Sequence, residues 1–195
     1  MTTTESQAGA AHRWWRSLGP VTTETGHVLP GDRATLARLR RCSTVLEAAT
    51  EPATARLIKD VGFNQHNDEH VARAAALAVA LAHVREDARG DRNKIARAIG
   101  TPLGREPNDA PLKPSRFRTL MAARTGDEVL TGFRRVVAIL DCTAHVCNLA
   151  ELILGWTDDE SGDRVRTRFA FDYYGAGDYA PPAEADHSAT IIAKA

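Results

Sequence analysis

One short segment of the sequence carries residue types that could bind a catalytic metal. The segment 66–70 reads His-Asn-Asp-Glu-His and fits the H-x-x-E-H pattern of inverted zinc peptidases. Two histidines four residues apart lie on one side of a helix, where they could bind zinc beside a glutamate base. However, Asn67 and Asp68 are typical capping residues, which would leave His66 outside the helix, and a third ligand is needed. A zinc-dependent helical hydrolase that uses His66, Glu69 and His70 therefore stays an alternative interpretation.

A second group of soft ligands, Cys142, His145 and Cys147, lies within six residues. On a helix, the two cysteines would point about 140° apart, and the sequence holds no second pair of closely spaced cysteines. Small core residues are the better interpretation. Since the sequence also lacks a phosphate-binding loop, a dinucleotide-binding turn and a nucleophile elbow, we expect no catalytic residues, no metal site and no cofactor.

Arginine is the residue type in this sequence that most clearly indicates a function, namely binding of nucleic acid. Of the 25 basic residues 21 are Arg, and residues 85–135 hold 12 basic residues against 7 acidic ones. The planar guanidinium suits phosphate oxygens, although codon bias and simple solvation could also explain the arginines. In a helix that carries Phe133 and Val137 on its inner face, Arg134 and Arg135 point outward. The candidate nucleic-acid-binding residues are Arg38, Arg40, Arg41, Arg97, Arg116, Arg118, Arg134, Arg135 and Arg166.

Helical periodicity dominates the segments that must position these arginines. In residues 127–140, Phe133, Val136, Val137 and Leu140 follow the spacing of a helix with one buried face. The other expected helices cover 11–18, 33–42, 52–62, 69–86, 115–124, a segment with Val146, Leu149, Ile153 and Trp156 on one face, and 163–174. No segment shows the alternation of a strand, so the predicted class is all-α.

The proline-rich segment 100–114 predicts a linker between two helical parts. An N-terminal helical layer, 11–99, is expected to pack with a C-terminal four-helix bundle, 115–176. The ends, 1–10 and 177–195, are expected to be mobile. The sequence shows no signal peptide and no membrane-spanning run, and its three cysteines suit a reducing compartment, so a cytoplasmic location is predicted.

Several motifs in order resemble a known family. They are Trp14-Trp15-Arg-Ser-Leu18, the segment 32–42, Arg116-Phe-Arg118, the segment 133–140, Asn148-Leu149 with Trp156, and the segment 164–174. In this order and spacing they resemble CasB, the small-subunit family of the type I-E CRISPR Cascade complex. The sequence departs from the family at Phe169, where Trp is expected, and in its longer tail after Gly175.

The resemblance implies a non-catalytic subunit of a ribonucleoprotein. Its expected partners are the guide RNA and target DNA, through backbone contacts, the other Cascade subunits and a second copy of itself. Two further interpretations stay open. The chain could be a helical adaptor that binds only proteins, and the Trp14-Trp15 pair could lie in the core or at a partner contact.

Overall fold

Helices make up most of the computed structural model, which describes residues 3–22, 25–101 and 106–175. The α-helices are α1 (Thr3–Leu18), α2 (Arg33–Arg41), α3 (Val45–Ala49), α4 (Pro52–Asp60), α5 (Asp68–His83), α6 (Ile95–Ile99), α7 (Pro114–Ala122), α8 (Gly126–Ile139), α9 (Val146–Trp156) and α10 (Gly162–Tyr173). Strands β1 (Val21–Thr22) and β2 (Val28–Leu29) form an antiparallel pair. Strands β3 (Glu86–Asp87) and β4 (Thr143–Ala144) form a parallel pair. The 3₁₀ helices are η1 (Asp91–Asn93) and η2 (Pro107–Asp109). The all-α prediction is confirmed.

Local sequence signals account for where several helices begin. At α2, the Asp32 side chain accepts a hydrogen bond from the backbone N–H of Thr35. Before α8, Thr125 and Glu128 form a reciprocal capping box. Proline occupies the first turn of α4 and of α7, where its missing N–H costs nothing.

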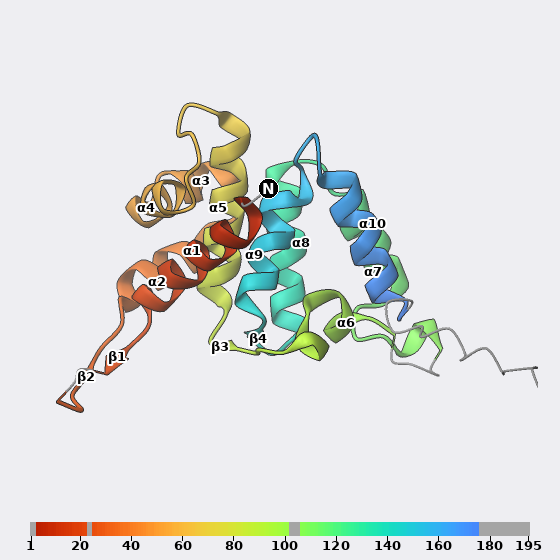
Figure 1. Ribbon diagram of the computed structural model, residues 1–195, viewed down its shortest axis with the longest axis horizontal. Helices are drawn as coiled ribbons and strands as arrows, with labels where there is room; N and C mark the ends of the chain where they lie inside the picture. Colours follow the sequence, from red (N-terminus) through yellow and green to blue (C-terminus); the bar gives the residue numbers. More distant parts are fainter. Residues whose placement is uncertain (1–2, 23–24, 102–105, 176–195) are drawn as a thin grey trace, which may run out of the picture.

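Helix α5 lies at the centre of the fold and packs against α2, α3 and α4 as well as α8 and α9 (Figure 1). All ten residues from Arg73 to Ala82 are buried. Six of the ten are alanines, whose small side chains let neighbouring helices approach closely. Along this run the helix is buried on every side, because α2, α3 and α4 as well as α8 and α9 pack against it.

An aromatic cluster joins the helices of the C-terminal half. Trp156 meets Phe133 and Phe169 edge to face, each with ring centroids 5.1 Å apart. Phe117 of α7 stacks on Tyr173 of α10 at 3.8 Å, and the Tyr173 hydroxyl donates a 2.6 Å hydrogen bond to the Leu112 carbonyl. The segment before α7 is thereby attached to α10.

The N-terminal and C-terminal helices share one continuous core. Helix α1 packs on α9, and α5 packs on α8 (Figure 1). Helix α1 begins at Thr3 and so includes most of the segment 1–10, whose expected mobility stays a prediction. Part of the predicted linker is also packed, since Ala110 and Leu112 are buried. The predicted mobile tail, 177–195, lies outside the described residues.

Two short helices, α3 and α6, were absent from the sequence-based prediction. Each has five residues, too few to show a helical period. Trp14 is in the core and donates a 2.9 Å hydrogen bond to the Ala53 carbonyl. Trp15 is partly exposed, and its indole N–H donates to the Val84 carbonyl at 3.3 Å.

Candidate nucleic-acid interface

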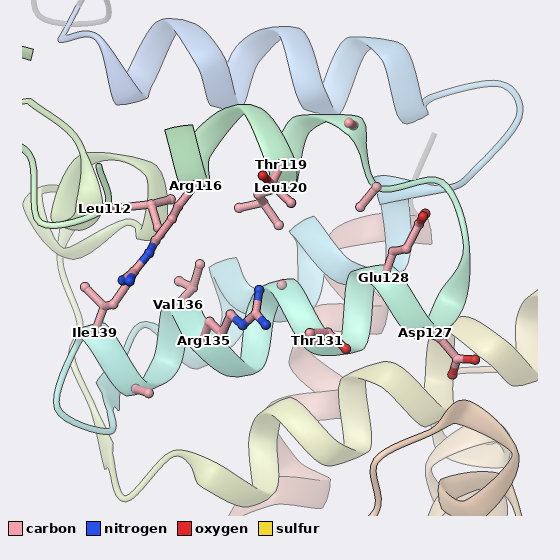
Figure 2. A pocket seen from close by; sticks show the side chains of 14 residues that line it. Leu112, Arg116, Thr119, Leu120, Asp127, Glu128, Thr131, Arg135, Val136 and Ile139 are labelled. Carbon is pink, nitrogen blue, oxygen red and sulfur yellow. The ribbon is translucent and has the colours of Figure 1, made fainter. Parts of the chain in front are cut away.

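A groove of about 920 Å³ runs between α7 and α8. The larger apolar side chains in its lining are Leu112, Leu120, Val136 and Ile139 (Figure 2). Gly132 of α8 allows this packing, because a Cβ at that position would lie 2.6 Å from the Leu120 side chain. The groove is therefore an open hollow between two closely packed helices.

Two arginines enter this groove from its opposite walls. Arg116 extends from α7 and Arg135 from α8 (Figure 2). Both residues are exposed, and neither has a carboxylate partner within the described parts of the chain. Their positive charges are consequently available to an external anion.

Two carboxylates lie farther along the same groove, but backbone N–H groups occupy both of them. Asp127 accepts a 2.6 Å hydrogen bond from the Val45 N–H. Glu128 accepts hydrogen bonds from the N–H groups of Arg124, at 2.8 Å, and Thr125, at 3.0 Å, and these bonds lower the pKa of its carboxyl. These capping roles direct both acids away from Arg116 and Arg135, so one end of the groove is cationic (Figure 2).

Three of the nine candidate arginines are instead paired within the protein. Arg38 donates to Glu51 at 2.9 Å and also to the Thr35 hydroxyl. Arg97 pairs with Asp91 and lies 3.7 Å from a carboxylate oxygen of Asp172. These contacts reduce the charge that Arg38 and Arg97 present to an outside ligand.

Arg166 is the third paired residue. Its guanidinium donates to the Trp156 carbonyl and to Asp163, and only 12% of its side chain is exposed. It fastens the start of α10 to the end of α9, a structural role that the charge pattern of the sequence did not reveal.

The remaining candidate arginines do not form one continuous surface with the groove. Arg40 donates to the Ala82 carbonyl at 2.6 Å, and Arg134 contacts the Cys42 carbonyl at 3.4 Å. Both lie close to His83, whose imidazole pKa is lowered first by burial and then by these two charges. Arg41 and Arg118 are exposed.

A second cationic hollow, of about 780 Å³, lies beside α2. Arg40 lines it together with Arg33 and Arg85, and no acidic residue is part of this lining. Arg33 and Arg85 are absent from the candidates that the sequence indicated, because nothing in the local pattern distinguishes them from solvated arginines. The hollow forms only when the turn after α5 meets α2.

The histidines of the 66–70 motif have other structural roles. The ring of His70 stacks on Phe63 with centroids 4.3 Å apart, and its Nδ1 accepts a hydrogen bond from the Asn64 N–H at 3.1 Å. His66 precedes the N-cap residue Asn67 and is exposed. Across the described residues, no group of three or more His, Cys, Asp or Glu side chains is arranged to hold a metal ion. The geometry lends the zinc hydrolase alternative no support.

The fold and the groove together define a small, all-helical protein whose free arginines line an open surface. The family described as CRISPR-associated protein Cse2 matches residues 35–174, which is more than half of the chain. The chain therefore belongs to the Cse2 family, also called CasB, and is a subunit of the type I-E CRISPR Cascade complex. Members of this family are non-catalytic subunits that assemble with other Cascade proteins.

No curated protein and no solved structure matches this chain. Within the described residues, none of the helices is long and apolar enough to cross a membrane.

Proposed function

We propose that this Cascade subunit binds the sugar-phosphate backbone of the guide RNA–target DNA heteroduplex and of the displaced strand, in the cytoplasm and without catalysis. The observation that carries the proposal is the pair Arg116 and Arg135, two exposed and unneutralised guanidiniums directed into one groove. Phosphate contacts hold a nucleic acid in place without reading its sequence. This suits a complex in which base pairing with the guide supplies the specificity.

The groove also has the chemistry of a backbone site. The hydroxyl of Thr131 accompanies the two arginines in its lining, and apolar side chains complete it. Arginine and threonine side chains are common donors to phosphate oxygens. Arg40, Arg41 and Arg134, with Arg33 and Arg85, provide a second cationic surface for the same polymer or for its neighbouring subunits. Binding of a second copy of the chain and of other Cascade subunits is part of this proposal.

The test removes the two groove charges in a reconstituted complex. We expect Arg116→Ala with Arg135→Ala to weaken target DNA binding similarly for every matched guide and target. The steepness of log K against log salt should fall by about 0.9 for each phosphate that is no longer neutralised, and so by about 2 for the pair. The measurement is equilibrium binding of target DNA over a range of salt concentrations.

Two controls make the result specific. Arg13→Ala with Arg16→Ala removes the same charge from exposed positions on α1, outside the groove, and should leave the slope nearly unchanged. Arg116→Lys with Arg135→Lys retains the charge and should retain most of the slope. If the alanine pair assembles normally and binds DNA with wild-type affinity and slope, the groove is not a backbone site. The adaptor interpretation would then be preferred.

A further inference from the structure

An exposed stripe of arginines and aromatic rings follows the outer side of α10. Arg164, Arg168 and Phe171 recur at intervals of four and three residues, which places them on one face of α10, and the C-cap residue Tyr174 follows three residues later. Phe171 is 59% exposed and Tyr174 is 52% exposed, although rings of this size are usually buried. The proposed phosphate groove between α7 and α8 makes no use of this face.

The Tyr174 ring is held in one orientation by its neighbours. It meets Phe117 at 5.5 Å and Tyr173 at 4.9 Å, with the ring planes at 75° and 85°. Tyr173 is itself buried and hydrogen-bonded to the Leu112 carbonyl. The exposed ring is thus fixed by the core, which reduces the entropy that a ligand must remove on binding.

Cations lie on both sides of this ring. Tyr174 lines a hollow of about 380 Å³ with Arg124, and a second hollow of about 710 Å³ with Lys113 and Arg118. Arg124 donates to the Met121 and Ala123 carbonyls, and Lys113 donates to the Asn108 carbonyl. Because neutral carbonyls orient these cations without neutralising them, the charges remain available.

The one carboxylate in the lining of these two hollows is already engaged. Asp163 pairs with Arg166, and the other lining residues are uncharged or cationic. The surface therefore combines exposed aromatic rings with positive charge.

From this arrangement we infer that the α7–α10 face binds single-stranded nucleic acid by stacking unpaired bases on Phe171 and Tyr174. Stacking on aromatic side chains beside a cationic groove is the common mode of sequence-tolerant single-strand binding. A duplex does not fit this chemistry, because its bases already stack on one another. Arginine and aromatic residues are also enriched in protein interfaces, so a protein contact at this face is kept as an outcome of the test.

The inference rests on the proposed nucleic-acid function but concerns a different surface and a different part of the ligand. The groove arginines contact phosphates, so they cannot distinguish a strand with bases from one without them. The aromatic rings contact the bases, so they can distinguish these two strands. A comparison of oligothymidylate with an abasic oligomer of the same length therefore separates the two sites.

The experiment measures binding of both oligomers to the full-length chain by fluorescence anisotropy at low salt. We expect Phe171→Ala and Tyr174→Leu each to weaken oligothymidylate binding about 5- to 100-fold. Binding of the abasic oligomer should change less than about twofold. Tyr174→Leu keeps an apolar side chain against Phe117, and Phe171→Trp should preserve or strengthen binding.

Leu46→Ala is the matched control, since Leu46 is an exposed apolar residue on α3, at 76% exposure. It should leave both affinities unchanged. In contrast, Arg116→Ala with Arg135→Ala should weaken binding of both oligomers alike. If this pair has no effect while the aromatic variants still weaken oligothymidylate binding, the groove proposal fails and the stacking inference stands.

Three outcomes would overturn the inference. The first is an equal decrease in binding of both oligomers in the aromatic variants. The second is unchanged oligothymidylate binding, or none in the wild type. The third is normal nucleic-acid binding with failed assembly into Cascade, which would assign Phe171 and Tyr174 to a protein contact.

Discussion

The buried arginine of α5 offers a sharp test of how the two halves of the fold are joined. Arg73 is the charged residue at the start of the long buried run of this helix, and only 8% of its side chain is exposed. Its guanidinium donates to Asp158 at 2.7 Å and to the Leu154 carbonyl at 3.1 Å, and lies 5.4 Å from the centre of the Phe63 ring. It therefore connects α5 to the turn between α9 and α10.

The magnitude follows from the burial of the two partners. Removing one member of a fully buried ion pair costs about 3–5 kcal/mol, because the remaining charge stays uncompensated. Asp158 is one-third exposed, with 32% of its side chain accessible, and Glu69 lies 4.0 Å from Arg73 as a second carboxylate. We therefore expect Asp158→Asn to lower the free energy of unfolding by about 2 kcal/mol.

Urea denaturation followed by circular dichroism measures this change. Arg73→Met combined with Asp158→Asn should be more stable than the sum of the single changes implies, since methionine leaves no buried charge. Asp159→Asn, at an exposed position in the same turn as Asp158, is the matched control and should change stability by less than about 0.5 kcal/mol. A decrease below about 0.5 kcal/mol for Asp158→Asn would refute the reasoning.

The same pair has a pH dependence of known sign. Burial raises the pKa of the Asp158 carboxyl, but hydrogen bonds from Ser161 and Arg73 outweigh that effect and the pKa is lowered from 3.8. A lowered pKa means that the ionised carboxylate stabilises the folded state at every pH above the ordinary pKa of the carboxyl group. The stabilisation should disappear as the pH falls below about 3.8, and Asp158→Asn should lose this part of the pH dependence.

Two further predictions concern other parts of the core. Leu149 of α9 is fully buried, so Leu149→Ala should lower the free energy of unfolding by about 2–5 kcal/mol in urea denaturation. A change below about 0.5 kcal/mol would mean that this face of α9 is not in the core. His83 donates through Nδ1 to the Val79 carbonyl, and burial lowers its pKa from 6.5. The neutral ring is therefore the form that the fold prefers, and stability should decrease as the pH falls below about 6.5. His83→Gln should flatten this decrease, and an identical pH profile in that variant would contradict the assignment.

The sequence by itself determined the helical class and the positions of most long helices. These depend on local chemistry, such as the Asp32 cap of α2, the proline that opens α4, and the apolar spacing of α8 that buries Phe133 and Val137. A residue's place on its own helix follows from the helical period and needs no knowledge of the partner helix. The resemblance to the small-subunit family likewise depended on motifs and their order in the sequence.

Only the tertiary structure decided which arginines are available. Arg38 and Arg97 are paired because Glu51, just before α4, and Asp172, on α10, reach them from elsewhere in the chain. Arg116 and Arg135 share a groove because α7 and α8 pack side by side. The helical period shows on which side of its helix a side chain lies, but not which residues it contacts there. That depends on the packing of segments far apart in the chain, and it separates a structural arginine from one that can bind an external anion.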